Sequence, residues 1–319
     1  MDDITFINDN FIEKNTNFID LIEVLKTAFA QSSIEVPMRH HHDFDNPKED
    51  KSSTLLLMPA WNPGKDSGVK IVTVSPNNGK YNLPAIHGTY IYLDAHKGTV
   101  KGILDAKSLT SKRTAAASAL ASSYLSKEDA SSMLMIGTGA LAPNLILAHA
   151  SVRPIKKVFV WGLSLEKSQR LCNQLKNEDF EIGIVNTIEE VISKVDIVSC
   201  ATLSPTPLVL GKHLKPGQHI DLVGAFQKHT READDEAVLK SSVYVDTFEA
   251  GLKESGDIVI PLAKGIITED DVLGDLFELC GNKKIGRISN DEITFFKSVG
   301  HGLEDLAAAS YYFKKFNDE

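Results

Sequence analysis

The sequence predicts an α/β protein in which a Rossmann-type domain with a doubly wound parallel sheet is inserted into a second, α+β domain. Three observations support this prediction. Residues 54–94 form strand-like runs that alternate apolar and polar side chains, as half-buried antiparallel strands do. Residues 128–287 alternate short apolar runs with helical segments, which is the pattern of a parallel sheet. A glycine turn, GTGALA, follows the first of these runs at residues 137–142.

The N-terminal region is expected to be a helix followed by a small antiparallel sheet or barrel. Residues 18–31 repeat apolar side chains with helical spacing. The strand-like runs STLLLMPAW, GVKIVTVSP and IHGTYIYLD come next, separated by Gly, Pro and Asn turns. The alanine-rich segment 109–126 then predicts a helix that begins at Thr110 or Ser111, because these residue types cap helix N-termini well.

The middle of the chain supplies the parallel strands. Beyond SSMLMIG, the strand-like runs are KKVFVWG, EIGIVN, VDIVSCAT, HIDLVGAF and SSVYVD. We expect the closing segment from Asp291 to be one long helix, interrupted near Gly300 and Gly302, that returns to the N-terminal domain. The expected domains are therefore residues 1–125 with 292–319, and residues 126–291.

The composition is that of an ordinary globular protein with an acidic surface. Of 319 residues, 42% are hydrophobic and 24% are charged, and the formal net charge is −9. This charge argues against a nucleic acid or an anionic membrane as partner, since both require basic surface. The N-terminus does not resemble a signal peptide, and no run of about 18 apolar residues predicts a membrane span. Three scattered cysteines match no metal or disulfide spacing, so we expect a cytoplasmic protein.

The glycine turn has the spacing G-x-G-x-x-A between an apolar run and a helical segment. Gly137 permits the tight turn, Gly139 lets the backbone approach a pyrophosphate, and Ala142 allows helix and strand to pack closely. The helix N-terminus adds N–H groups and partial positive charge. The alternative is a turn that holds no ligand. We predict a nicotinamide dinucleotide bound by Gly137, Thr138, Gly139, Ala140 and Leu141.

The end of the second strand indicates which dinucleotide is used. An acidic residue at the strand end would bind the ribose hydroxyls of NAD, but Trp161 is followed directly by Gly162, Leu163 and Ser164. Ser164, Lys167 and Arg170 are instead suited to a 2′-phosphate, which favours NADPH, with NADH as the alternative. The two cations also fit the solvated face of a helix.

Several segments resemble the ornithine cyclodeaminase/μ-crystallin family over nearly the whole chain. They are VPMRHHH, GVKIVTVSPNN, LTSKRTAAASALA, IGTGA, VDIVSCAT, LKPGQHIDLVGA and EITFFKSVG. The resemblance implies a homodimer in which the N-terminal domain and the C-terminal helix bind substrate, while a Rossmann domain binds NAD(P)(H). The further cofactor contacts that it implies are Thr202, Val223, Ala225 and Gly300.

The resemblance also implies substrate residues, namely Arg39, Lys70, Thr89 and Arg113, with Lys70 and Arg113 as the catalytic pair. Lys70 lies within a strand, where a buried ammonium needs a partner such as a substrate carboxylate. The alternative is a lysine whose amine reaches water at the strand end. Arg113 is expected in the first helical turn, where the helix dipole disfavours a cation unless an anion binds there. An exposed arginine that tolerates this small penalty is the alternative.

Two further positions bear on the activity. Phe226 stands where ornithine cyclodeaminases of the family place an aspartate, which puts cyclodeamination in doubt and suits an apolar ring. His301 belongs to a segment that the family places near the nicotinamide, either as a substrate contact or as a structural histidine. The run His40–His42 is not expected to bind a metal, since successive strand residues point to opposite faces.

These features predict an oxidoreductase most similar to the ketimine reductases of the family. The expected reactions convert Δ1-pyrroline-2-carboxylate to L-proline and Δ1-piperideine-2-carboxylate to L-pipecolate. The alternatives are an alanine- or opine-type amino-acid dehydrogenase, an ornithine cyclodeaminase, and a non-catalytic NADPH-binding protein like a crystallin. The expected partner is a small cyclic imino acid.

Overall fold

The computed structural model describes residues 4–225 and 227–318, which form two compact units. We call residues 4–113 with 301–318 the N-terminal unit and residues 114–300 the Rossmann unit. The chain leaves the N-terminal unit after Arg113 and returns to it at His301.

The N-terminal unit is built on a six-stranded sheet with the order β1-β6-β5-β4-β3-β2. Neighbouring strands are antiparallel except for β1 and β6, which are parallel. The antiparallel strands expected between residues 54 and 94 are confirmed as β3, β4 and β5. The strands are β1 (Thr5–Ile7), β2 (His40–Phe44), β3 (Ser53–Asn62), β4 (Asp66–Val74), β5 (Ile86–Asp94) and β6 (Val100–Asp105).

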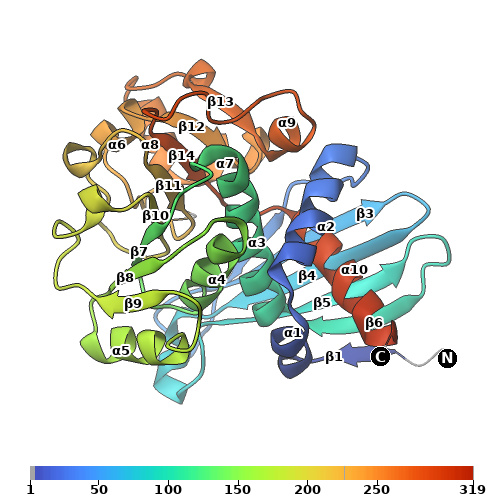
Figure 1. Ribbon diagram of the computed structural model, residues 1–319. Coiled ribbons are helices and arrows are strands. Elements are labelled where there is room, and N and C mark those ends of the chain that lie inside the picture. Colours follow the sequence, from blue (N-terminus) through green and yellow to red (C-terminus); the bar gives the residue numbers. More distant parts are fainter. Residues whose placement is uncertain (1–3, 226, 319) are drawn as a thin grey trace. The chain divides into compact units, whose positions relative to one another are not determined.

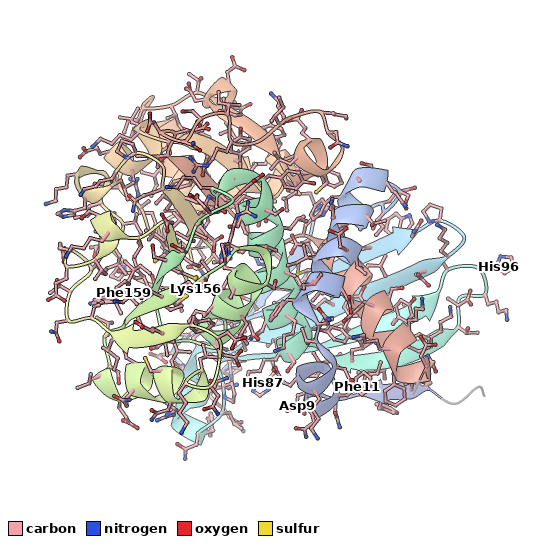
Figure 2. The ribbon with its side chains drawn as sticks, viewed as in Figure 1. Asp9, Phe11, His87, His96, Lys156 and Phe159 are labelled. Atoms are coloured by element: carbon pink, nitrogen blue, oxygen red, sulfur yellow. The ribbon has the colours of Figure 1, made fainter. Side chains whose placement is uncertain are left out.

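Helices cover one face of this sheet. They are α1 (Asp9–Asn15), α2 (Phe18–Gln31) and α10 (Gly302–Asp318). Helix α2 has the predicted bounds, and α10 lies along it while packing on β3, β4 and β5 (Figure 1). Helix α1 reaches the end of α10 through Phe11 (labelled in Figure 2), and the ring centre of Phe11 is 5.0 Å from that of Phe316.

The two faces of the sheet differ in burial because side chains alternate along each strand. The face toward α10 is buried and includes Met58, Lys70, Tyr90 and Leu104. The opposite face carries apolar side chains that stay partly exposed. Among them are Leu57, Val69, Ile71, Ile91 and Ile103.

Helix α3 (Ala106–Leu125) begins earlier than the sequence suggested. The cap is Asp105, whose carboxylate accepts the backbone N–H of Ser108 at 2.7 Å, so the expected start at Thr110 or Ser111 was wrong. Arg113 therefore lies well inside the helix, not in its first turn.

The Rossmann unit contains an eight-stranded sheet whose paired strands are all parallel, in the order β13-β12-β14-β11-β10-β7-β8-β9 (Figure 1). The six apolar runs predicted as strands between residues 131 and 246 are confirmed. The strands are β7 (Ser132–Ile136), β8 (Lys157–Trp161), β9 (Glu181–Ile184), β10 (Ile197–Cys200), β11 (His219–Leu222), β12 (Ser242–Val245), β13 (Val272–Asp275) and β14 (Thr294–Lys297). The helices are α4 (Ala142–Val152), α5 (Leu165–Gln174), α6 (Asp235–Leu239), α7 (Phe248–Glu254), α8 (Gly256–Ala263) and α9 (Leu276–Cys280).

Strand β14 corrects the prediction for the end of the chain. The segment from Asp291 was expected to be one interrupted helix, but Thr294–Lys297 is fully buried and pairs with both β11 and β12. Only the part from Gly302 onward is helical, as α10, and it does belong to the N-terminal unit. Among the residues that the structure describes, no helix is long and apolar enough to cross a membrane.

Candidate active-site residues

Two buried cations meet a pair of acidic residues in the N-terminal unit. Lys70 Nζ on β4 lies 2.7 Å from Asp305 Oδ2 on α10. Arg113 on α3 donates through Nε to Asp305 Oδ1 at 2.9 Å and through Nη1 to Glu304 Oε2 at 2.6 Å. The two acids are fully buried and the cations nearly so. Three elements distant in sequence thus form one cluster of charges.

The electrostatics of this cluster lower the proton affinity of Lys70. Burial, and secondarily the nearby guanidinium groups of Arg113 and Arg39, lower the pKa of Lys70 to about 8, although Asp305 opposes the shift. Burial by itself would raise the pKa of Asp305, but Arg113 and Lys70 outweigh it and hold that pKa below its usual value. Lys70 is therefore a lysine that can exchange a proton close to neutral pH.

The cluster changes two arguments made from the sequence. Lys70 was expected to need a substrate carboxylate as its partner, but Asp305 already supplies one. Arg113 was expected to be unfavourably placed in a first helical turn, whereas it is an interior residue balanced by Glu304 and Asp305. Lys70 and Arg113 lie together, and carboxylates of the chain itself balance the charge of each.

The other expected substrate residues are placed differently. Arg39, just before β2, is close enough to Lys70 to act on its pKa. Thr89 pairs with Ile71, so its side chain leaves the sheet on the face opposite Lys70, and its hydroxyl donates to the carbonyl of Leu104 at 3.3 Å. The structure thus does not bring Thr89 to the cluster, and its contact with substrate stays a prediction.

His301 directly precedes α10, where its carbonyl accepts the N–H of Glu304 at 3.1 Å. Phe226 lies outside the described residues. His40–His42 form most of the exposed strand β2, with the rings of His40 and His42 on one face, 6.2 Å apart. Within residues 4–225 and 227–318, no group of three His, Cys, Asp or Glu side chains is arranged to hold a metal.

Glu304 and Asp305 were missed by the sequence analysis. A signal for them exists, because they form an acidic pair between Leu303 and Leu306 in a helix that continues with three alanines. Two adjacent acids on the buried part of a helix require partners. Nothing in a single sequence identifies those partners as Lys70 and Arg113.

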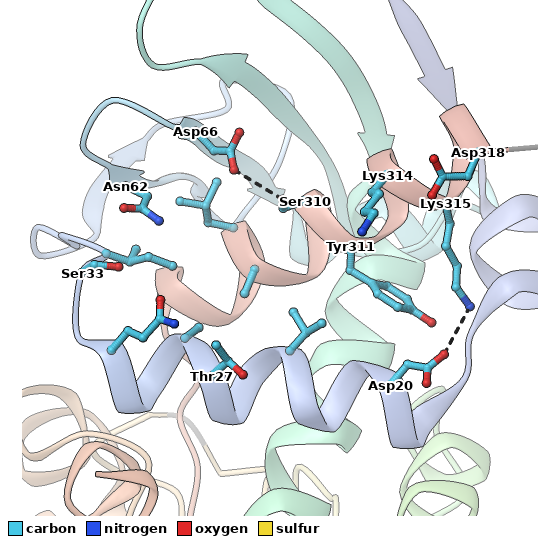
Figure 3. A pocket seen from close by; sticks show the side chains of 16 residues that line it. Asp20, Thr27, Ser33, Asn62, Asp66, Ser310, Tyr311, Lys314, Lys315 and Asp318 are labelled. Atoms are coloured by element: carbon cyan, nitrogen blue, oxygen red, sulfur yellow. Dashed lines mark hydrogen bonds and ion pairs between the residues drawn. The ribbon is translucent and has the colours of Figure 1, made fainter.

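A pocket of about 520 Å³ also lies in the N-terminal unit, beside α2 and α10 (Figure 3). Polar residues at its rim include Asp20, Asp66 and Lys315, and Lys315 is paired with Asp20 across 3.7 Å. It contains none of the expected substrate residues, and its labelled charged groups are partly exposed rather than buried. We therefore place the candidate substrate site at Lys70 and Arg113 and not in this pocket.

The glycine turn of the Rossmann unit fits a dinucleotide. Gly137 has a φ of 115°, and a Cβ there would lie 2.6 Å from the carbonyl oxygen of Ala201. A Cβ at Gly139 would meet nothing within 4 Å, so this glycine borders open space. In the described part of the chain, the backbone N–H groups of residues 138–141 donate no hydrogen bond. Together with the N-terminus of α4 they form the cradle that a pyrophosphate requires.

Three residues after β8 were expected near a 2′-phosphate, and the side chains of two of them have partners within α5. Ser164 caps α5 by accepting the N–H of Lys167 at 3.3 Å. Arg170 is exposed and pairs with Glu166 at 2.7 Å, as the solvated-face alternative describes. Lys167 is exposed and forms no ion pair with the described residues, so it is the better candidate for a 2′-phosphate contact.

The other expected cofactor residues follow the carboxyl ends of three adjacent strands, where ligands bind in doubly wound sheets. Thr202 follows β10, Val223 and Ala225 follow β11, and Gly300 follows β14. Gly300 has a φ of 81°, and its N–H donates to the buried carboxylate of Asp246 at 2.6 Å. The structure brings these loops to one edge of the sheet.

A Rossmann unit with a dinucleotide cradle and a second unit with a buried lysine–arginine cluster define a nicotinamide-dependent oxidoreductase. The family model of the ornithine cyclodeaminase/mu-crystallin family matches residues 5–319, and the chain belongs to this family. A Δ1-pyrroline-2-carboxylate reductase from Colwellia psychrerythraea is 34% identical over 316 residues, which cover 96% of this chain and 98% of the relative.

Two solved structures are similar to the whole chain. The Δ1-pyrroline-2-carboxylate reductase of Thermococcus litoralis, in complex with NADH and L-proline, has a TM-score of 0.91 and 31% identity, covering 99% of this chain and 98% of that one. An archaeal alanine dehydrogenase dimer with bound NAD has a TM-score of 0.90 and 25% identity, with 99% and 96% covered.

Proposed function

We propose that the protein reduces cyclic ketimines with NAD(P)H, converting Δ1-pyrroline-2-carboxylate to L-proline and Δ1-piperideine-2-carboxylate to L-pipecolate. The observation with most weight is the likeness over 99% of the chain to a reductase solved with NADH and L-proline. Both halves of that chemistry have matching residues here, the dinucleotide cradle in the Rossmann unit and the cationic cluster in the N-terminal unit.

The ring carboxylate is assigned to Arg39 and Arg113. The cluster brings Arg39, Lys70 and Arg113 together with the carboxylates of Glu304 and Asp305. Asp305 and Glu304 fix the plane of the Arg113 guanidinium before substrate binds, and a fixed guanidinium suits a two-point contact to a carboxylate.

Lys70 is assigned to the imine nitrogen. When bound, the reduced nicotinamide supplies the hydride that the imine carbon accepts. The nitrogen must also gain a proton, so that the C=N double bond becomes the C–N single bond of a secondary amine. With a pKa of about 8, Lys70 carries a proton near neutral pH and holds it less tightly than an ordinary lysine. Asp305 keeps the ammonium in place.

The cofactor preference is assigned to NADPH, with NADH also accepted. None of the residues 162–164 directly after β8 is acidic and able to bind a ribose hydroxyl, and Lys167 is available for a 2′-phosphate. The solved relatives carry NADH or NAD, which fits a site that accepts both cofactors.

The assembly is assigned as a homodimer formed through the partly exposed apolar face of the six-stranded sheet. That face includes Leu57, Ile71 and Ile91, and the helices α1, α2 and α10 of the N-terminal unit lie on the opposite side of its sheet. Apolar surface of this kind is usually buried by a partner, and the related alanine dehydrogenase is a dimer.

The direct test follows NADPH and NADH oxidation with a panel of acceptors. Five- and six-membered cyclic ketimines should be reduced, with NADPH used at least as well as NADH. Pyruvate with ammonia tests the alanine dehydrogenase activity of the second solved relative, and L-ornithine tests cyclodeamination, for which we expect no ammonia release. Faster turnover of pyruvate with ammonia than of either ketimine would overturn the assignment, and no turnover of any acceptor would indicate a binding protein.

A further inference from the structure

Glu232 is a buried carboxylate that ties together two loops of the Rossmann unit. Its Oε1 accepts the backbone N–H of Thr202 at 2.7 Å and the Thr202 hydroxyl at 3.2 Å. Its Oε2 accepts the N–H groups of Gly224 at 2.7 Å and Ala225 at 3.1 Å. Thr202 follows β10 and the other two follow β11, so one side chain fixes the loops after two neighbouring parallel strands.

Glu232 is itself held by two buried charges. Asp257 Oδ1 accepts the N–H groups of Glu232 at 2.7 Å and of Ala233 at 2.9 Å. Lys297, at the end of β14, places Nζ 3.1 Å from Asp257 Oδ2 and 3.6 Å from Glu232 Oε2. All three charged side chains are fully buried. Such a cluster contributes little net stability but fixes geometry when every group has a partner.

The bonds to Glu232 determine the direction of three carbonyl groups. In a trans peptide, the N–H of one residue points opposite to the C=O of the residue before it. The carbonyls of Ala201, Val223 and Gly224 therefore point away from Glu232. That of Ala201 lies against Gly137 of the dinucleotide turn. Those of Val223 and Gly224 accept no hydrogen bond from the described residues, although both residues are buried.

Gly224 lies so close to these groups that no side chain would fit there. A Cβ there would lie 2.2 Å from both the N and the O of Thr202 and 2.6 Å from Glu232 Oε1. Buried carbonyls without a partner are rare, and a ligand with N–H donors would satisfy them. In a doubly wound sheet the second strand faces the adenosine half of the dinucleotide. The strands on the other side of β7, which are β10 and β11, therefore face the nicotinamide half.

We infer that Glu232 is a positioning residue for the nicotinamide, because it holds the peptides whose Val223 and Gly224 carbonyls accept the N–H groups of the nicotinamide carboxamide. This inference rests on the proposed use of a nicotinamide dinucleotide. It does not depend on which imine is reduced. The adenosine and pyrophosphate part of the ligand is bound elsewhere, by the glycine turn and the residues after β8.

Binding of NADH and of ADP-ribose separates this role from a general effect on folding, because ADP-ribose lacks only the nicotinamide. Calorimetric titration without substrate should show NADH bound about tenfold more weakly by Glu232→Ala, the loss of roughly one or two hydrogen bonds. ADP-ribose affinity should remain within about twofold of wild type by the same reasoning. Glu232→Gln, which keeps the shape and one acceptor, should lie between wild type and Glu232→Ala.

Asp196 provides a matched control. Its Oδ2 also accepts two backbone N–H groups, those of Ser131 at 2.9 Å and Ser132 at 3.0 Å, but at the amino end of β7. Asp196→Asn should leave the ratio of NADH to ADP-ribose affinity unchanged.

An equal loss of affinity for NADH and ADP-ribose in the Glu232 variants would show a structural role and overturn the inference. Unchanged affinity for NADH would also overturn it. If Glu232→Ala does not fold, Glu232→Gln decides by the same ratio. A wild-type protein that binds both NADH and ADP-ribose but reduces no imine would refute the proposed function alone. Binding of neither ligand would refute both.

Discussion

At the scale of single residues, the protonation of Lys70 is set by burial and by the carboxylate of Asp305. Asp305→Asn removes the group that raises the pKa of Lys70, while burial, Arg113 and Arg39 still lower that pKa. The pKa of Lys70 in the variant should therefore lie below the wild-type value of about 8. If the protonated lysine is needed, kcat/KM of the wild type should fall as pH rises through about 8. In Asp305→Asn the same fall should occur about one pH unit lower or more.

Profiles of kcat/KM against pH for pyrroline-2-carboxylate test this shift. Asp94→Asn is the matched control, since Asp94 lies in the same sheet and pairs with Lys101 at 3.3 Å, away from the cluster. An alkaline limb at the same pH in Asp305→Asn and wild type would show that Asp305 does not control Lys70.

Arg113 offers a second residue-scale prediction. Arg113→Lys keeps the charge but loses the planar group that contacts Asp305 and Glu304 together. We expect kcat/KM for the ketimine to fall about 10²-fold, equivalent to roughly 2–3 kcal/mol. Affinity for NADH should be unchanged. Lys112→Arg, at the neighbouring cation that pairs with Glu13, should have nearly wild-type kinetics, and equal kinetics in both variants would remove Arg113 from the site.

Replacement of Arg113 by alanine is less informative than replacement by lysine. Arg113→Ala leaves the two fully buried carboxylates of Glu304 and Asp305 with fewer partners. Breaking a buried pair costs about 3–5 kcal/mol of stability. The sequence supports the choice of Lys70 and Arg113, because a buried cation needs an anion. It does not reveal that the anions lie about two hundred residues away on α10, since no local pattern links them.

At the scale of elements, the start of α5 tests cofactor choice. Lys167 is exposed and lies in the first turn of α5, while Arg170 is engaged with Glu166. Lys167→Glu should lower kcat/KM for NADPH by about tenfold, because a carboxylate repels the 2′-phosphate, and should leave NADH within about twofold. Arg170→Glu is the matched control with a smaller effect. An equal fall in kcat/KM for NADPH and NADH in Lys167→Glu would mean that Lys167 does not contact the 2′-phosphate.

The helices and strands were predicted well where the apolar side chains repeat with one spacing over many residues. Helix α2 and the strands β3, β4 and β5 have long, regular patterns. The prediction failed at short elements beside strong helical patterns. Strand β14 is only four residues long and precedes α10 closely, so its aromatic pair was read as part of that helix. The start of α3 was misplaced because Asp105, the last residue of β6, serves as the cap.

At the scale of the whole molecule, the open face of the six-stranded sheet predicts the oligomeric state. Ile91 lies in the middle of this face, between Val69 on β4 and Ile103 on β6, and is partly exposed. A glutamate there points away from the Lys70 cluster, because Tyr90 and Tyr92 occupy the other face. Within a dimer interface the same glutamate would be a buried, unpaired charge, which costs several kcal/mol.

Ile91→Glu should therefore shift the protein from dimer to monomer in light scattering coupled to size-exclusion chromatography. Leu273→Glu is the matched control, because it puts the same charge on an exposed apolar strand position in the Rossmann unit, 39% exposed on β13. It should remain a dimer. A monomeric wild type would refute the proposed dimer, and an Ile91→Glu variant that stays dimeric at low micromolar concentration would place the interface elsewhere. Because α10 packs on the opposite face of the same sheet, Ile91→Glu also measures whether an intact dimer is needed for ketimine reduction.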